Sequence, residues 1–387
     1  MDPRRSDKER GGTIFKGTFF TLREDCLRRK ELFVDKNFPP SRDCWLLAAI
    51  ATLTLNPKLF HFIVPCDQGF YYKYAGIFHF RFWQYGRWQD VYVDDLLPTY
   101  RGRLVFMHSK TKNEFWCALL EKAYAKLYGG YEALKGGNVG ESMVDLSGGV
   151  VEMVDLREPP SNLFGMIRNA CRRGAMMGED ERDKLGITFD DDGEFWMPFS
   201  DFISNFTAMD ICDITPDVFT SQLDCDSDDE ECIVKEQRHR QWKMRIMEGE
   251  WIQGKTAGGC RNFLDTFHMN PQKVVLLDRP DDDDPDNCTL VVSVMQKYVR
   301  QRKRYGIDYI PIGFAVYKLP PGVVPGRPLD TDFFRYNATC GRSPCFLNTR
   351  EVSYHFSFPP GVYVVIPSTF EPDCEAEFLL RIFTESH

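Results

Sequence analysis

The sequence lacks any apolar run long enough to cross a membrane, and its first twelve residues, MDPRRSDKERGG, are polar and charged. A membrane-spanning helix needs about 20 mostly apolar residues, and a secretory leader needs a shorter apolar region near its start. The sequence therefore predicts neither a transmembrane segment nor a secretion signal. We expect a cytoplasmic protein.

Zinc-type Cys-x-x-Cys pairs are also absent, although the chain has 13 cysteines. An odd number of scattered cysteines is typical neither of a disulfide framework nor of a structural zinc site. In a reducing cytosol thiols stay reduced, so we expect most of these cysteines to be small core residues.

An excess of basic charge is missing as well, because the formal net charge is -9. This balance argues against a general nucleic-acid-binding protein. Hydrophobic residues make up 43% of the 387 residues, which is enough for sizeable cores in two or three domains.

The first half of the chain is predicted to be rich in helices. Residues 1–41 indicate a polar lead-in with one short helix near residues 21–33. Residues 45–55 are uncharged and rich in Leu and Ala, which predicts a buried helix. Residues 69–93 alternate aromatic with polar residues, the pattern of antiparallel strands.

Helical spacing returns in residues 113–134 and again in residues 161–173. In the first of these segments the apolar positions recur at helical intervals. The charged side chains of Glu121 and Lys122 are therefore expected to point outward.

The second half, residues 242–387, is predicted to be all-β. Short β-like runs are separated by turns rich in Pro and Gly, which is typical of a β-sandwich or a barrel. The acidic stretch LDCDSDDEEC at residues 223–232 is predicted to be a solvated linker, and we expect a domain boundary near it.

Cys44 stands directly before an apolar run, in RDCWLLAAIATLTLN. If Cys44 opens a helix, its sulfur faces free backbone N–H groups and the positive end of the helix dipole. Both favour the thiolate, which is the nucleophilic form. These residues alone also allow the alternative that Cys44 is a core thiol.

Several longer stretches carry a family resemblance. They are DCWLLAAIATLTLN, NEFWCALLEKAYAKLYGGYEALKGGNVGESMVDLSGGVVEMVDL, DDGEFWMPFSDFISNFTAMDICDITPD and AGGCRNFLDTFHMNPQ. These segments resemble calpains, and the resemblance covers roughly residues 14–387. It implies an α+β fold, with an incomplete papain-like calpain protease core followed by a C2-like all-β sandwich.

The resemblance also implies four segments. They are an N-terminal lead-in at residues 1–41, protease subdomain 1 with the Cys helix at 42–155, a truncated protease subdomain 2 at 156–215 and the C2-like domain at 216–387.

The partners that Cys44 would need are missing where the resemblance places them. In papain-like chains His and Asn follow the Cys by about 130–150 residues. The corresponding window, residues 174–194, holds no His, and none occurs between His108 and His239. The Gly-His-Ala and Asn-Pro-Trp stretches of calpains are both absent, and a long piece is missing around Gly178–Glu179.

A second gap lies just before Cys44. Calpains carry a Gln-Gly-x-x-Gly-Asp-Cys run here, whose Gln belongs to the oxyanion hole. This chain reads FPPSRDC, with only Asp43 in common, and it has no Gln before Cys44. The joint falls near Pro40–Arg42, and two such clean gaps resemble skipped exons or a faulty gene model. Four other histidines are predicted to be structural: His61, His79, His108 and His268.

Calcium is the cofactor that the resemblance implies. Glu141 in NVGESM matches a ligand of the first calcium site of the protease core, and Asp192 and Glu194 in DDGEFW match ligands of the second. The remaining ligands would lie in the missing pieces, so each site is expected to be at best half built. Alternatively, these three residues are ordinary surface carboxylates.

Two charged segments of the β region also match calpains: the acidic residues 278–286 and the basic residues 297–304. In calpains such segments are linked to calcium and phospholipid response, and the alternative is that they are solvated loops. Nothing resembling the penta-EF-hand domain follows His387, so pairing with a small regulatory subunit is not expected.

Three functional interpretations remain open. The first is a calcium-dependent cysteine endopeptidase that cuts protein substrates with Cys44 as nucleophile. The second is an inactive calpain-like chain, such as a truncated isoform, that binds protein partners, substrates or membranes through its C2-like domain. The third is a protease core that never becomes stable. We expect calpain ancestry with little or no protease activity.

Overall fold

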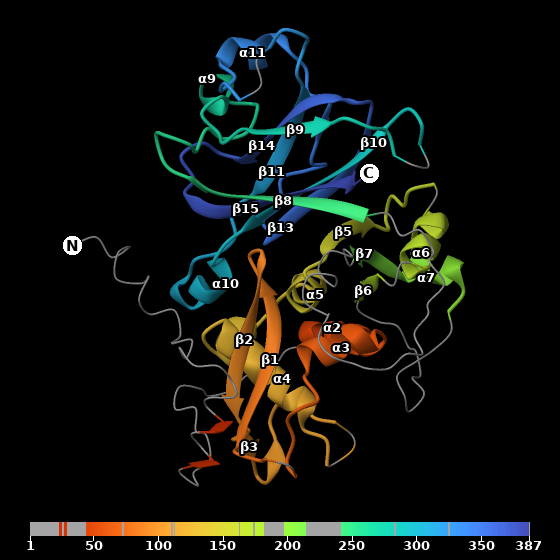
Figure 1. Ribbon diagram of the computed structural model, residues 1–387, viewed down its shortest axis with the longest axis vertical. Helices are drawn as coiled ribbons and strands as arrows, with labels where there is room; N and C mark the ends of the chain where they lie inside the picture. Colours follow the sequence, from red (N-terminus) through yellow and green to blue (C-terminus); the bar gives the residue numbers. More distant parts are fainter. Residues whose placement is uncertain are drawn as a thin grey trace, which may run out of the picture. The chain divides into compact units, whose positions relative to one another are not determined.

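The computed structural model forms two compact units, Met1–Ile214 and Thr215–His387 (Figure 1). It describes residues 23–24, 27–28, 44–71, 73–109, 111, 113–161, 163–172, 175–181, 197–213, 241–281, 284–323 and 326–386. The predicted acidic linker lies outside these residues. Of the predicted lead-in helix, the four described residues are helical.

The first unit opens with two helices, α2 (Cys44–Thr54) and α3 (Pro57–Ile63). The helix predicted at residues 45–55 is confirmed, but it is buried on one face only, because Leu47 on the other face is exposed. The Asn56 side chain caps the start of α3 by accepting a hydrogen bond from the Leu59 N–H at 3.1 Å. Pro57 suits the first position of α3, because a backbone N–H at that position would have no hydrogen-bond acceptor within the helix.

Trp45 anchors α2 to the rest of the unit. Its indole N–H donates to the Leu134 carbonyl at 3.0 Å, and its ring meets the Tyr124 ring edge-on at 5.9 Å. Gly137 lies directly against the indole, because a Cβ built there would come within 2.3 Å of the ring. The cysteine helix is therefore positioned by a large buried side chain that has little space to move.

The aromatic segment forms the hairpin of β1 (Ile77–Gln84) and β2 (Arg87–Asp94). The antiparallel prediction for this segment is confirmed. Tyr85 and Gly86 make the two-residue turn, both with positive φ, as a type I′ turn requires. Two short paired strands follow, β3 (Thr99–Tyr100) and β4 (Arg103–Leu104).

The next segment forms α4 (Trp116–Leu127), the 3-10 helix η2 (Tyr131–Leu134) and α5 (Val139–Ser147). The helical prediction is right, but the expected outward direction of Glu121 and Lys122 is wrong, since they are only 1% and 2% exposed. The partners of these two side chains come from β2 and from the residues after it. The spacing of residues along α4 gives no information about them.

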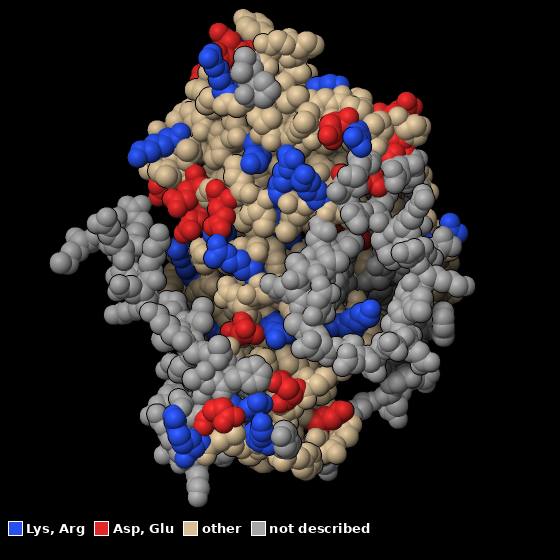
Figure 2. All heavy atoms as spheres, in the orientation of Figure 1, with Lys and Arg blue, Asp and Glu red and all other residues tan. Residues whose placement is uncertain are grey.

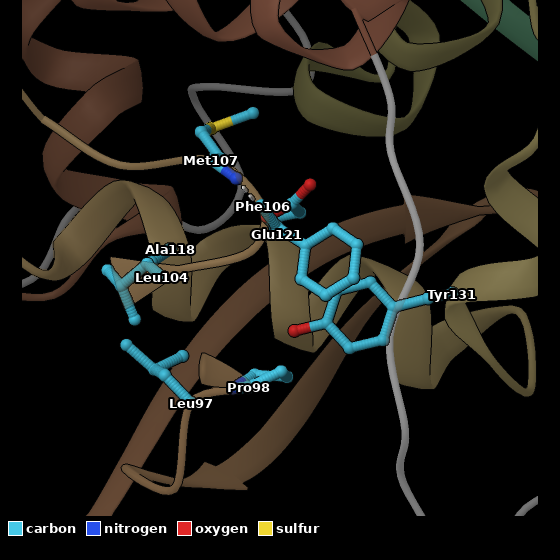
Figure 3. A pocket seen from close by; sticks show the side chains of 8 residues that line it. All are labelled: Leu97, Pro98, Leu104, Phe106, Met107, Ala118, Glu121 and Tyr131. Carbon is cyan, nitrogen blue, oxygen red and sulfur yellow. Dashed lines mark hydrogen bonds between the residues drawn. The ribbon is translucent and has the colours of Figure 1, made fainter. Parts of the chain in front are cut away.

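Lys122 forms a buried ion pair with the fully buried carboxylate of Asp94 at the end of β2. Its ammonium group also donates to the Leu96 carbonyl at 2.7 Å. The Glu121 carboxylate accepts the Met107 backbone N–H at 2.9 Å (Figure 3). Both charges are thus satisfied inside the unit.

The end of the first unit is a small sheet with helices beside it. Its order is β5–β7–β6, and both pairings are antiparallel. The bounds are β5 (Val150–Asp155), α6 (Leu163–Arg172), β6 (Met176–Glu181), α7 (Phe199–Asn205) and β7 (Phe206–Asp213). The predicted helix at residues 161–173 is confirmed as α6, whose apolar side packs on β5 and β7.

The second unit contains two antiparallel four-stranded sheets, β13–β10–β15–β8 and β12–β11–β14–β9. The bounds are β8 (Gln241–Trp251), β9 (Lys273–Leu277), β10 (Cys288–Gln296), β11 (Ile312–Lys318), β12 (Gly341–Arg342), β13 (Glu351–Phe358), β14 (Gly361–Thr369) and β15 (Ala376–Ser386).

One hydrophobic core lies between these two sheets. Val292 and Leu380 from the first sheet belong to the same buried cluster as Val316 and Val365 from the second. Because the sheets pack face to face around one core, the unit is a sandwich, and the barrel alternative is excluded.

Short helices complete this unit: α9 (Leu264–Phe267), α10 (Val299–Arg302), η3 (Lys303–Tyr305) and α11 (Thr331–Tyr336). Phe267 of α9 and Phe334 of α11 pack with residues of β11 and β14 in a second buried cluster. Figure 1 shows the two helices at one end of this unit. Among the described helices of the chain, none combines the length and the apolar character that crossing a bilayer requires.

Replacing Lys122 with Met should lower the free energy of unfolding by about 3–5 kcal/mol, because Asp94 would keep a buried charge without its cation. Urea unfolding of the full chain, followed by tryptophan fluorescence, measures this change. Lys58→Met on the exposed side of α3 is the matched control, and it should change stability by less than about 0.5 kcal/mol. Equal stabilities of the two variants would contradict the ion pair.

Replacing Gly137 with Ala should destabilise the first unit by about 1–3 kcal/mol, because the new methyl group would displace the Trp45 ring. The midpoint of thermal unfolding should fall for this variant. Gly69→Ala serves as its control, since nothing lies within 4 Å of a Cβ built at that glycine. An unchanged midpoint for Gly137→Ala would show that the indole is not held closely.

Candidate active site

Cys44 is the first residue of α2, so its backbone lies at the positive end of an eleven-residue helix. Its side chain lies outside the described part of the structure. The helix itself is held by Trp45, the next residue, through the bond to Leu134. The chain therefore provides a fixed helix start for a thiol, which is one of the environments that favour a cysteine nucleophile.

The strand that contacts α2 from the small sheet is β6, with the sequence Met-Met-Gly-Glu-Asp-Glu. It includes Gly178–Glu179, where the sequence predicts a missing piece. Beside the cysteine helix, this strand carries acidic residues and neither an imidazole nor a carboxamide. The side chains of residues 177–181 lie outside the described part.

The described histidines of the first unit make local contacts. The ring nitrogens of His79, on β1, lie 3.6 and 3.7 Å from carboxylate oxygens of Asp67 and Asp90. The contact with His79 is the main cause that lowers the pKa of Asp90. The Nδ1 of His108 lies 2.8 Å from the Phe106 carbonyl oxygen.

One more described histidine lies in the first unit and two lie in the second. His61, in α3, has its Nδ1 3.1 Å from the Cys66 sulfur. In the second unit His268 lies 3.0 Å from the Thr331 hydroxyl, and His355 is on β13. The contacts of His108 and His268 are typical of histidines that hold local structure.

A small pocket lies between α4 and the segment that precedes it (Figure 3). Its volume is about 10 Å³, enough for one water molecule. The stacked rings of Phe106 and Tyr131, 4.6 Å apart, form part of its wall. This pocket is too small for a substrate side chain and is a feature of core packing.

The structure describes one of the three matched calcium ligands, Glu141. Glu141 lies in the first turn of α5, where the Asn138 side chain accepts its backbone N–H at 3.3 Å. Asp192 and Glu194 lie outside the described residues. In the part of the chain that is described, no three His, Cys, Asp or Glu residues gather as a metal site would require. Ca²⁺ takes six to eight oxygens, of which the Glu141 carboxylate could supply at most two.

A neighbouring contact involves α5 and β7. The Gly140 N–H, one residue before Glu141, donates to the Asp210 carboxylate at 3.2 Å. On the same helix the buried Asp145 accepts hydroxyl hydrogen bonds from Tyr124 and Tyr128. The sequence analysis missed these acids because each partner lies 17 to 70 residues away. Both acids are used in holding the unit together.

In the second unit, part of the acidic segment stabilises its own loop. The buried Asp281 accepts the Thr289 N–H at 2.9 Å. Asp284 accepts hydrogen bonds from Asn287 and Asp286, and the Asn287 side chain is the main cause that lowers its pKa.

Part of the basic segment is likewise used internally. Lys297 pairs with Glu248 at 2.6 Å, and Arg300 is buried. The uncovered parts of the face drawn in Figure 2 carry separate groups of acidic and of basic side chains. These segments are therefore partly structural, which neither of the two sequence-based alternatives included.

The chain matches two family models. A family described as "Calpain family cysteine protease" matches residues 40–181 and 178–213, and "Calpain large subunit, domain III" matches residues 247–383. The first match is in two parts that meet in β6.

Similar proteins include Calpain-B of Drosophila melanogaster, 38% identical over 503 aligned residues that cover 99% of this chain and 53% of the relative. The calpain-1 catalytic subunit of Bos taurus is 42% identical, covering 89% of this chain and 57% of the relative. Human Calpain-9 is 38% identical, and the alignment covers 95% of this chain and 67% of the relative.

Two features of these comparisons concern length. The chain spans about half the length of several of the relatives that it matches. The alignment with Calpain-B is also 116 positions longer than the 387 residues of this chain, so it includes at least that many residues of the relative without a counterpart here. From the two family matches and the extent of these identities, the chain belongs to the calpain family of cysteine proteases.

Proposed function

We propose that this chain is a calpain-family protein with little or no peptidase activity of its own, although it keeps Cys44 at the nucleophile position. The observation that carries the proposal is the interrupted family match at residues 178–181, within the strand that contacts the cysteine helix. The family's catalytic His and Asn would follow this point, and the sequence has no His between His108 and His239.

The chemistry of a thiol protease explains why this gap matters. A base must take the thiol proton and return it to the leaving amine, and a third group must orient that base. An oxyanion hole must also hold the charge of the tetrahedral intermediate. Loss of one oxyanion donor alone costs roughly 10²–10³ in kcat. A chain without base, orienting group and donor should lose nearly all activity.

Two further observations support an incomplete core. The family match begins at residue 40, close to the proposed joint at Pro40–Arg42. The long alignment with Calpain-B leaves more than a hundred residues of the relative unmatched. Both fit a chain that joins family segments across two deletions.

The calcium, partner and compartment assignments belong to the same proposal. Calcium would be the family cofactor, but its two sites in the protease core would keep only Glu141 in one and Asp192 and Glu194 in the other. The second unit would be a C2-like domain that binds protein partners or a phospholipid surface in the cytoplasm. Pairing with a small subunit through a penta-EF-hand domain is not part of the proposal.

The second candidate is an active calcium-dependent cysteine endopeptidase. It is favoured by the start of α2 at Cys44, which gives the thiol the helix-end position that stabilises a thiolate. Activity would then require a base from a residue outside the described part.

The purified chain should not cleave casein, with or without calcium, at a rate above that of its Cys44→Ala variant. Casein cleavage followed on gels over hours tests this, with a complete calpain under the same conditions as positive control. A circular dichroism spectrum with helix and strand content should accompany the assay. It separates an inactive folded chain from the third interpretation, an unstable core.

Cleavage that needs both calcium and Cys44 would overturn the proposal and support the endopeptidase. Cleavage that survives Cys44→Ala would point to a contaminating protease, and it would be removed by repurification before the comparison is repeated.

Replacing Glu141 with Gln should leave the calcium affinity of the full chain unchanged, because one carboxylate does not make a calcium site. Isothermal titration with CaCl₂ measures the affinity of each variant. A tenfold weaker affinity for Glu141→Gln would mean that a complete site exists around α5. Asp201→Asn, on exposed α7, controls for the loss of one negative charge.

A further inference from the structure

Cys66 and His61 form an exposed pair on the surface of the first unit. The Cys66 sulfur lies 3.1 Å from Nδ1 of His61, and both residues are exposed to solvent. His61 stands in the last turn of α3, and Cys66 lies in the turn that follows this helix. The pair combines a nucleophilic sulfur with an imidazole nitrogen that can accept a proton.

The turn that carries Cys66 is held at three points. Val64 continues the helical bonding, because its N–H donates to the Phe60 carbonyl at 2.7 Å. Gln68 makes two side-chain hydrogen bonds, 2.7 and 2.8 Å long, with the backbone of His79 on β1. Arg23 donates to the Asp67 carbonyl at 3.0 Å. Since residues on both sides of Cys66 are tied down, the sulfur is kept opposite the imidazole.

The charges near the pair are mixed. Lys58 lies one turn before His61 on α3, and Asp67 follows Cys66 directly. The Asp67 carboxylate faces His79 at 3.6 Å and Arg23 at 4.0 Å. The Arg81 guanidinium lies over the Phe62 ring, 4.8 Å from its centre. The neighbourhood therefore includes cations as well as acids, among them Asp90, which lies 3.3 Å from Arg81.

Other described cysteines have a different environment. Cys288 and Cys340 donate to backbone carbonyls, and burial raises the pKa of each thiol. Burial, together with Glu371 and Asp373, also raises the pKa of the Cys374 thiol. A smaller fraction of such thiols is ionised at neutral pH, so they react slowly.

We propose that Cys66 is a site of reversible thiolation by small disulfides, with His61 as the base that activates it. This inference does not depend on whether Cys44 is catalytic. His61 accepts the Cys66 proton, and the thiolate attacks one sulfur of a low-molecular-weight disulfide. The disulfide bond of the reagent breaks as the new one forms. The leaving thiolate takes the proton from His61, so the products are the mixed disulfide and one free thiol.

Site-resolved thiolation of the folded full chain tests this. The chain is exposed briefly to oxidised glutathione at neutral pH, free thiols are blocked with N-ethylmaleimide, and tryptic peptides are quantified by mass. Cys66 is the one cysteine in the peptide of residues 59–73, and Cys345 is the one in residues 343–350. Cys44 falls in a separate peptide, residues 43–58, so the two sites are read independently.

Cys66 should react about tenfold faster than the exposed Cys345, which provides an internal reference in the same sample. His61→Asn keeps a polar atom at this position but removes the base. It should slow Cys66 by about tenfold and leave Cys345 unchanged. Cys66→Ser should remove the added mass from the peptide of residues 59–73 altogether.

The buried Cys117, alone in the peptide of residues 113–122, reports whether His61→Asn stays folded. It should remain unmodified in both proteins. If it becomes modified in His61→Asn, the milder His61→Gln is compared with the same prediction. A Cys66 rate no higher than that of Cys345, or one that a folded His61 variant does not change, would overturn the proposal.

Discussion

The packing of Trp45 sets the position of the cysteine helix. Its indole is enclosed by Tyr124 and Gly137 and bonded to the Leu134 carbonyl, so α2 is tied to α4, η2 and the loop before α5. Large buried aromatic side chains contribute strongly to core stability, and a bonded indole also has a defined orientation. Cys44, one residue earlier, therefore begins a helix whose place is decided by packing and does not require a catalytic partner.

Buried charges give both units a second kind of constraint. Lys122 and Asp94 pair inside the first unit, and Arg381 and Glu351 pair inside the sandwich, where the Ser293 hydroxyl also donates to Glu351. Burying an ion pair costs desolvation energy that its attraction roughly offsets, so these pairs add little net stability. Losing one partner is costly, however, which makes alternative arrangements of these strands and helices unfavourable.

This separation between scaffold and chemistry underlies the proposed function. The contacts that hold α2, the β1–β2 hairpin and α4 use no residue of a catalytic triad, so they can persist when the base and the oxyanion donor are missing. A protease site, in contrast, needs each of its groups within hydrogen-bond reach of the reacting atoms. Deletions near β6 and before α2 would thus remove activity while leaving much of the first unit able to pack.

Local sequence patterns were sufficient to predict three features. These are the helix after Cys44 from its uncharged Leu- and Ala-rich run, the hairpin from its aromatic alternation, and most strands of the sandwich from short β-like runs between turns. The same local spacing wrongly placed Glu121 and Lys122 in solvent, since their partners come from β2 and from residues near Met107. It also could not choose between a sandwich and a barrel, which depends on how two sheets close around one core. Nor could it bring the Cys66 sulfur to His61, a contact that depends on the fold of the turn after α3.

By itself, the sequence indicated the family, an apolar helix directly after Cys44 and the absence of a histidine over a long internal stretch. The tertiary structure alone decided which charged side chains are buried and which thiol faces an imidazole. The physical reason is that residue spacing records which side of an element is apolar. The partner of a polar group is chosen by distant segments that only folding brings together.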